Sequence, residues 1–211
     1  MIYRDKKELI EDLVHANDVV LDVGFWGQGV QINDKDWVHN LILNISNRVY
    51  GIDINYNDDD VSKINSLENY RKGSAENLNF ETSFDIIFAG DLIEHLSNCG
   101  LFIEACKSKI SDRGKLILTT PNCFNLFNLA EKITKSEPTV NHDHVCYFNS
   151  KTIIALLNKN GFYDIEIHHL YSLNIKYKES TRKKFLNVVY FLLSKFSPKF
   201  IETLVVVAKK R

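Results

Sequence analysis

Segments typical of buried strands alternate along this chain with segments of helical periodicity. Residues 6–15, 37–45 and 101–110 place apolar side chains three and four positions apart, as one face of a helix requires. The predicted strands between them are residues 18–23, 48–54, 84–89 and 115–120. This alternation predicts an α/β protein with a doubly wound, mainly parallel sheet covered by helices on both faces.

The last third of the chain continues the pattern. Residues 111–114 (SDRG) predict a turn ahead of the fourth strand. Ser150 is placed to cap a helix that runs to residue 158, and Gly161 is placed to close it. Two late strands are predicted at residues 163–169 and 203–208.

The composition is that of an ordinary globular protein and excludes several other classes. Of the 211 residues, 45% are hydrophobic and 25% are charged, so a single domain over residues 1–211 can bury a core. The longest apolar run, residues 188–193, is far shorter than the ~20 residues of a membrane span, and no secretory signal opens the chain. The four cysteines form no CxxC pair, so we expect reduced thiols and a cytoplasmic location.

Charge is distributed unevenly along the chain. The net charge of −1 argues against general nucleic-acid binding. Residues 170–211 nevertheless carry ten Lys or Arg and two Glu, a net of +8, which leaves −9 for residues 1–169. The basic end therefore predicts a local contact with an anionic acceptor or with a membrane surface.

The loops that follow the predicted strands are the expected site, because ligands bind at the carboxyl ends of parallel strands. The loop after the first of these strands runs from Gly24 to Gly29 and is rich in glycine. Glycines let the backbone approach a nucleotide, and an acid that ends the next strand accepts hydrogen bonds from ribose hydroxyls. Asp53 stands in that position.

Five segments in the appropriate order resemble motifs of class I S-adenosylmethionine-dependent methyltransferases. They cover most of residues 19–162. The HDH sequence at 142–144, followed by FNS at 148–150, is similar to the small-molecule branch of that family. The five segments are Leu21-Asp22-Val23-Gly24, Gly51-Ile52-Asp53-Ile54, KGSAENL at 72–78, residues 84–96 ending in EHL, and RGKLILTTPN at 113–122.

This resemblance implies a fold, a cofactor and a reaction. The fold is a Rossmann-like sheet whose last strand is antiparallel, and the cofactor is S-adenosylmethionine. The reaction is methyl transfer to a small-molecule acceptor, which the matching branch suggests is a hydroxyl of a sugar or glycan intermediate. The implied cofactor-binding residues are Asp22, Gly24, Phe25, Trp26, Gly27, Gly29, Asp53, Ile54, Ser74, Ala75, Glu76 and Gly90.

The chain departs from the family pattern at the glycine loop. Trp26 and Gln28 stand at two of its glycine positions, and Ser74 stands where the family often has an acid. These departures keep an alternative open, namely a cofactor-binding but catalytically inactive partner subunit. A dehydrogenase-like reductase is disfavoured, because the glycine spacing does not match GxGxxG and no Tyr-xxx-Lys pair follows the strand at residues 115–120.

A hydroxyl acceptor needs a base, and His95 is the candidate at the ligand edge. Asp91 is the second candidate catalytic residue, placed to hold the acceptor or the amine of the cofactor. Glu94 is expected to cap the following helix. His95 itself has a structural alternative, packing at the start of that helix.

Asn122 and His144 are the expected acceptor-binding residues, and no metal is expected. The alternative for His142 and His144 is a metal site that assists methylation of a hydroxyl, although an HxH pair alone indicates this weakly.

The apolar segment at 182–196 has two interpretations. With its basic flank it is expected to form a helical insertion, over about 181–197, before the last strand. That helix either covers the acceptor side of the enzyme or contacts a partner or a membrane surface. The oligomeric state stays open.

Overall fold

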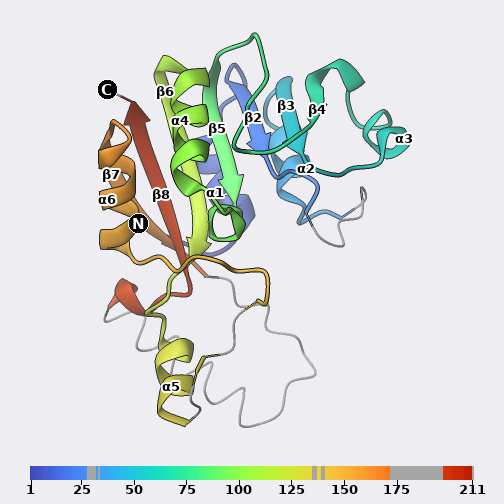
Figure 1. The fold of residues 1–211 in the computed structure, drawn as a ribbon. Helices are drawn as coiled ribbons and strands as arrows, with labels where there is room; N and C mark the ends of the chain where they lie inside the picture. Colours follow the sequence, from blue (N-terminus) through green and yellow to red (C-terminus); the bar gives the residue numbers. More distant parts are fainter. Residues whose placement is uncertain (28–31, 33, 135–136, 139–140, 172–196, 211) are drawn as a thin grey trace.

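One mixed sheet organises the part of the chain that the structure describes (Figure 1). The structure, a computed structural model, describes residues 1–27, 32, 34–134, 137–138, 141–171 and 197–210. Within these ranges the strand order is β1-β7-β8-β6-β5-β2-β3-β4. The strands are β1 (Ile2–Tyr3), β2 (Val19–Val23), β3 (Arg48–Asp53), β4 (Tyr70–Lys72), β5 (Phe84–Gly90), β6 (Ile110–Pro121), β7 (Phe162–Leu170) and β8 (Thr203–Lys210).

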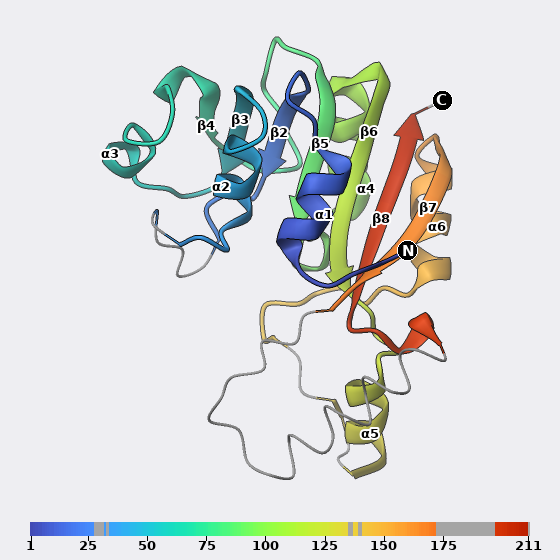
Figure 2. The same cartoon turned by 180° about the vertical axis from the view of Figure 1, so that it is seen from behind.

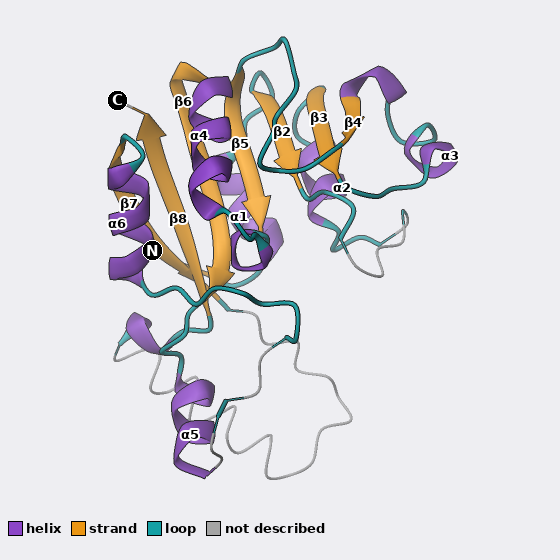
Figure 3. Cartoon of the chain, in the orientation of Figure 1, coloured by secondary structure: helices purple, strands orange, loops and turns teal. Residues whose placement is uncertain are grey.

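The direction of the strands confirms the predicted Rossmann-like topology. β8 runs antiparallel to β6 and β7, and the other neighbouring pairs are parallel (Figure 3). The chain builds outward from β2 to β3 and β4 and then crosses to β5 on the other side of β2. The strand order therefore reverses between β2 and β5, which is where ligands bind in open α/β sheets.

Helices cover both faces of the sheet. α4 (Cys99–Lys109) and α6 (Ser150–Lys159) lie on one face, and α1 (Lys6–Leu13) and α2 (Val38–Leu43) lie on the other (Figures 1 and 2). α5 (Leu126–Thr134) projects beyond the edge toward which β5 and β6 point. The remaining short elements are α3 (Asp58–Val61), η1 (Leu67–Asn69), η2 (Ile93–His95) and η3 (Pro198–Phe200).

Two hydrophobic cores follow from this arrangement, one on each face. Leu21 and Leu116 face the core under α4 and α6, whereas their neighbours Val20 and Ile117 face the core under α1 and α2, and all four are fully buried. Burying side chains of this size stabilises a fold by about 1.5–3 kcal/mol each. The central strands are apolar at successive positions for this reason, and polar groups are left to the loops at their ends.

Three local expectations differ from the structure. Residues 111–114 lie inside β6, which begins at Ile110, and not ahead of the strand; the register with β5 shifts there, from the single pair Phe84–Ile110 to the regular pairing that starts at Ile86–Lys115. The helix α6 is capped by Asn149, one residue before the expected Ser150. β4 was not predicted, since it has only three residues, two of them exposed.

The two predicted late strands are confirmed as β7 and β8. The predicted helix at 182–196 lies outside the described residues. Among the helices that the structure describes, none combines the length and apolar character that crossing a membrane requires.

The N-cap of α6 gives a first testable prediction. The Asn149 side chain accepts from the backbone N–H groups of Lys151 and Thr152, and the Thr152 side chain completes a capping box. The substitution Asn149→Ala should lower the free energy of unfolding by about 1 kcal/mol, because it leaves these N–H groups without that acceptor. Urea unfolding measures this loss. Asn158→Ala, at an exposed position of the same helix, is the control and should cost nothing; equal losses in both variants would contradict the capping role.

Candidate active site

The loop after β2 forms a pocket at the point where the strand order reverses. Gly24 and Gly27 both adopt positive φ angles, of 76° and 56°, which glycine tolerates. A Cβ atom at Gly24 would lie 3.1 Å from the side chain of Leu92. Together with Asp22, Phe25 and Gly90, the two glycines help to line a cavity of about 220 Å³. Gly29, also expected here, lies outside the described residues.

Asp53 ends β3 and faces this loop, as the sequence predicts. Its Oδ2 accepts from the backbone N–H of Trp26 at 3.0 Å, and its Oδ1 accepts from the N–H of Asn55 at 3.1 Å. Each carboxylate oxygen keeps further lone-pair capacity for a ligand hydroxyl. Ile54, the next residue, exposes 79% of its surface and so offers an apolar face beside the carboxylate.

Asp22 and Phe25 are more enclosed than the sequence suggests. Asp22 is buried, and its Oδ2 lies 3.0 Å from Nδ1 of His39. Phe25 is also buried, with its ring 4.9 Å from that of His39. His39 was missed by sequence reasoning, because only its helical spacing was visible and the contact with Asp22 joins α2 to β2.

Asp91 follows β5 with a strained backbone. Its φ of 50° is uncommon for a residue with a side chain, and such conformations concentrate at functional sites. Thr119 holds this geometry, since its Oγ1 lies 3.0 Å from both the N–H and the Oδ1 of Asp91. The Oδ2 of Asp91 pairs with Nζ of Lys6 at 3.1 Å.

Lys6 is a second residue that sequence reasoning missed. It begins α1 and lines the same cavity as Gly24 and Gly90. The sequence marked it only as the start of a helix, and nothing local signals its contact with Asp91, 85 positions away.

The segment after β4 lies beside the loop but is held by protein groups. The Oε1 of Glu76 accepts from the backbone N–H of Asn98 at 2.9 Å, so this carboxylate fastens the segment to the start of α4. Ser74 is exposed, and its Oγ accepts from the N–H of Glu76. Ala75 is buried in the core under α4 and α6.

His95 and His144 meet where the loop after β5 contacts the loop before α6. Their ring centroids are 4.6 Å apart with the planes nearly perpendicular, at 85°. Burial lowers the pKa of His144, and the neighbouring His95 lowers it further. The backbone N–H groups of Val145 and Cys146 both donate to the carbonyl of Glu94, which ties the His144 loop to η2.

Glu94 is buried at this junction, with only 2% of its surface exposed. Its Oε2 accepts from Oγ1 of Thr120 at 3.0 Å, while its Oε1 has no hydrogen-bond partner among the described residues. Burial raises the pKa of this carboxyl to about 7. The expectation that Glu94 caps the next helix was wrong, because α4 is capped by Asn98, whose Oδ1 accepts from the N–H of Leu101.

A second cavity opens at Glu94 and His144. Its volume is about 190 Å³, and its walls include Asn125, Asn128 and Tyr147. At its base, the N–H of Cys123 donates to the carbonyl of Phe148, so the segment carrying α5 leaves and rejoins the fold at one point.

The HxH pair does not converge on a metal ion. The His142 side chain is 88% exposed and pairs with the adjacent Asp143, whereas His144 turns toward His95. In the described part of the chain, Glu94, His95 and His144 instead bring one potential ligand atom each within 4.8 Å of one another. Oxygen and imidazole donors of this kind suit a divalent cation.

Asn122 has a structural role in the loop after β6. Its Nδ2 donates to the carbonyls of Lys199 and Ile201, at 2.8 and 3.0 Å, and its Oδ1 accepts from the N–H of Phe124. Both amide protons are therefore used within the protein, and the structure leaves Asn122 no donor for an acceptor molecule.

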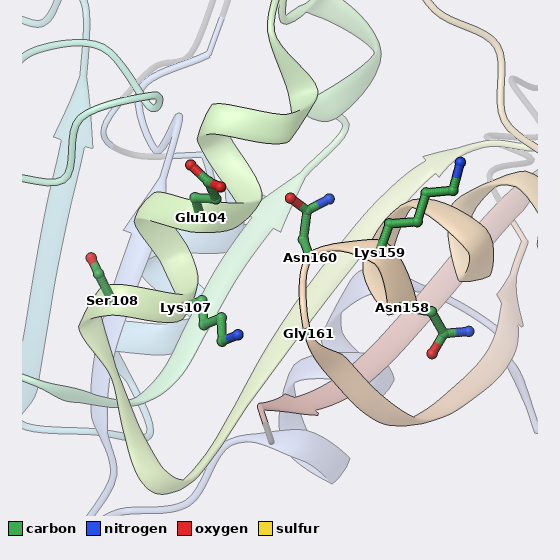
Figure 4. A pocket seen from close by; sticks show the side chains of 7 residues that line it. All are labelled: Glu104, Lys107, Ser108, Asn158, Lys159, Asn160 and Gly161. Carbon is green, nitrogen blue, oxygen red and sulfur yellow. The ribbon is translucent and has the colours of Figure 1, made fainter.

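A larger hollow, of about 600 Å³, lies away from these groups (Figure 4). It is lined by the last turns of α4 and α6, including Lys107, Lys159 and Gly161. These helix ends lie at the opposite edge of the sheet from α5 (Figure 1). The hollow therefore contributes nothing to the site built around Gly24 and His95.

Comparison with known proteins agrees with this geometry. A family described as a methyltransferase domain matches residues 34–167. Among curated proteins, the chain is 31% identical to a ubiquinone biosynthesis O-methyltransferase of Bartonella tribocorum, over 71% of this chain and 64% of the relative. It is 29% identical to the protein of the same name from Colwellia psychrerythraea, over 54% of this chain and 51% of that relative. The chain thus spans about half to two thirds of the length of these relatives.

Solved structures share the fold at low sequence identity. A putative methyltransferase from Bacillus halodurans superposes with a TM-score of 0.60 at 18% identity and covers 98% of both chains. A phosphoethanolamine N-methyltransferase from Haemonchus contortus, solved with S-adenosyl-L-methionine, superposes with a TM-score of 0.62 at 17% identity, over 97% of this chain and 52% of that one. The family match covers more than half of the sequence and confirms the resemblance carried by the motifs: this chain belongs to the methyltransferase-domain family.

Proposed function

We propose that this protein is an S-adenosylmethionine-dependent methyltransferase that methylates a hydroxyl group of a small-molecule acceptor. The observation that carries the proposal is the order of groups along one edge of the sheet. Gly90 lines the glycine-rich cavity after β2, and Glu94, four residues later, lines the second cavity together with His144. The His95 ring packs against that of His144. Family membership and the names of the two curated relatives, both O-methyltransferases, support it.

The residues that line the first cavity, and Asp53 on the loop beside it, fit this cofactor. Asp53 keeps acceptor capacity for the ribose hydroxyls. Lys6 and Asp22 line the cavity with opposite charges, which suits the carboxylate and ammonium of an amino acid. When bound, the cofactor supplies an electrophilic methyl group on a sulfonium, so the protein mainly has to align donor and acceptor.

His95 is proposed as the base. It takes the proton of the acceptor hydroxyl on a ring nitrogen while the oxygen forms its bond to the methyl carbon and the carbon–sulfur bond breaks. The lowered pKa of His144 favours its neutral form, so it does not repel the proton that His95 receives. Asp91, fixed by Thr119 and Lys6, holds the acceptor or the cofactor amine.

The class of acceptor is the finer part of the proposal. The sugar hydroxyl implied by the motif branch is one acceptor, and the relatives' names point instead to a step of ubiquinone biosynthesis. A transfer assay with labelled S-adenosylmethionine should therefore offer sugar and phenolic hydroxyls side by side. Turnover of either supports an active enzyme. Cofactor binding without turnover of any hydroxyl would favour the inactive-subunit alternative.

Asp53 provides a test of the cofactor site. The substitution Asp53→Asn should weaken binding of S-adenosylhomocysteine about 10- to 150-fold, because losing a hydrogen bond to a charged group costs about 1.5–3 kcal/mol. Isothermal titration calorimetry measures the change. Asp60→Asn removes a partly exposed carboxylate of α3, which pairs with nearby Lys63, and should bind as the unmodified chain does. Unchanged affinity in Asp53→Asn would remove Asp53 from the site.

His95 provides a test of the chemistry. The substitution His95→Ala should lower kcat by about 10²–10⁴-fold and leave cofactor affinity nearly intact, since only the proton transfer is lost. His142→Ala, which removes an exposed histidine of the neighbouring loop, is the matched control and should leave kcat unchanged.

Chelation distinguishes the base from a metal ion at the same residues. With His95 as the base, EDTA should leave turnover unchanged. Loss of turnover in EDTA, with recovery on adding Mg²⁺ or Zn²⁺, would instead assign Glu94, His95 and His144 as metal ligands.

Glu94 gives a prediction about pH and stability. Its pKa is raised to about 7 in the folded chain, so the folded state holds this proton more tightly than the unfolded one. The stabilisation from that proton is present below about pH 4.5 and is lost as the pH rises through about 7. Glu94→Gln keeps the neutral form at every pH.

The expected result is a difference between two pH values. Relative to the unmodified chain, Glu94→Gln should gain about 1–3 kcal/mol of unfolding free energy between about pH 5 and pH 8, in urea titrations with EDTA present. Glu104→Gln, at an exposed position of α4, should show no such gain. An equal gain in unfolding free energy in both variants, or no gain in either, would refute the effect of burial on the Glu94 pKa.

A further inference from the structure

Three polar side chains from different elements form a buried chain beneath the loop after β2. The Tyr70 hydroxyl lies 2.7 Å from Nε2 of His39, and Nδ1 of His39 lies 3.0 Å from Oδ2 of Asp22. The residues come from β4, α2 and β2. His39 is completely buried, and the exposures of Asp22 and Tyr70 are each 3%. Polar groups at this depth are costly unless each is paired, as these are.

The direction of the hydrogen bonds follows from the chemistry of the three groups. Burial raises the pKa of Tyr70 to about 12, so its hydroxyl keeps its proton at neutral pH. We assign the Tyr70 O–H as the donor to Nε2 of His39 and the Nδ1–H of His39 as the donor to Asp22. In this arrangement each of the three groups has a partner.

The His39 ring, held by these hydrogen bonds, also packs against Phe25 in the loop after β2 and against Trp37. The His39 ring lies 4.9 Å from the ring of Phe25 and 5.2 Å from that of Trp37. The Nε1–H of Trp37 donates to the backbone carbonyl of Phe25 at 2.7 Å. Gly51 in β3 leaves room for this cluster, because a Cβ atom there would lie 2.7 Å from Tyr70 and 2.8 Å from Phe25.

These packed side chains lie beside the part of the loop after β2 in which a glycine of the family motif is replaced. Trp26 stands at a position where the family motif has glycine, yet Asp22 and Phe25 on the preceding turn still line the cavity after β2. Asp22 faces two ways, toward His39 with Oδ2 and into the cavity lining. His39 does not line the cavity itself, so any effect on a ligand passes through its neighbours that do, namely Asp22, Phe25 and Trp37.

We propose that His39 is a positioning residue for the cofactor, which holds the Asp22 carboxylate and the Phe25 turn in their binding geometry. The inference rests on the proposed function, because Asp22 is assigned there to the cofactor. Substitutions in this buried chain should therefore affect cofactor binding without affecting proton transfer. Binding of the cofactor depends on the Tyr70–His39–Asp22 chain, whereas proton transfer at His95 does not.

The experiment compares three variants of the full chain with S-adenosylhomocysteine as the calorimetric probe. His39→Leu removes both hydrogen bonds and should raise Kd about tenfold or more. His39→Asn should recover part of this loss, because its amide N–H can reach Asp22 from the position of Nδ1. Tyr70→Phe removes one oxygen atom and should raise Kd about threefold. With saturating S-adenosylmethionine, kcat should stay within about twofold for all three variants.

Tyr50→Phe is the matched control. Tyr50 lies in β3 with its ring 5.5 Å from Phe84, in the core on the other side of the sheet from His39, and should bind the probe as the unmodified chain does. Wild-type Kd in both His39→Leu and Tyr70→Phe would overturn the inference, as would a fall in kcat that matches the loss of affinity. If His39→Leu fails to fold, Tyr70→Phe decides the question alone.

A spectroscopic readout is independent of the cofactor. Long-range ¹H–¹⁵N spectra should show His39 as the Nδ1–H tautomer, with its signals identified by their absence from His39→Asn; an Nε2–H tautomer would contradict the assignment. Failure of the unmodified chain to bind S-adenosylhomocysteine would refute the proposed function, and this inference with it. Normal binding in the unmodified chain and in every variant would refute only the inference.

Discussion

Burial of both faces of a parallel sheet is the constraint on which the rest of this structure depends. The central strands β2, β5 and β6 have apolar side chains on both sides and helices against each face. Such strands leave no face for polar chemistry, so functional groups collect at the carboxyl edge. Gly24, Asp53, Asp91 and His95 all lie within a few residues of a strand end there.

The two halves of the site are built by different means. The half around the loop after β2 is held by hydrogen bonds within the protein, from the Trp37 N–H on the Phe25 carbonyl to the Trp26 N–H on Asp53. The half around Glu94 and His95 instead has energetically unfavourable features: a positive φ at Asp91, a Glu94 oxygen with no hydrogen-bond partner among the described residues, and two histidine rings in contact. Such features are tolerated where the surrounding fold holds them and a ligand can relieve them.

The sequence was sufficient for features that depend on local pattern. Alternating periodicity predicted the sheet and its helices, and it placed Gly24, Asp53 and His95 at or shortly after strand ends, where the structure has them. Contacts between distant elements were not visible in it. Lys6 meets Asp91 across 85 positions and His39 meets Tyr70 across 31, and no spacing rule announces either pair. Glu94 was misassigned for a related reason, since an acid near a helix start suggests a cap, and only packing shows that it is buried beside Thr120. The turn predicted at residues 111–114 lies instead inside β6, at the shift in register between the pairs Phe84–Ile110 and Ile86–Lys115, which no local signal indicates.

The segment between Cys123 and Phe148 leaves and returns at a single point, where the N–H of one residue meets the carbonyl of the other. Because the two ends of this segment are already joined, its length can change with little effect on the sheet. Doubling the length of a closed loop costs only about 0.6 kcal/mol in entropy. Residues can be added or removed around α5 without displacing Gly24 or Asp53. Under the proposed function, a closed base of this kind separates the walls beside the acceptor from the edge that binds the methyl donor, so that the size of one can change while the geometry of the other is kept.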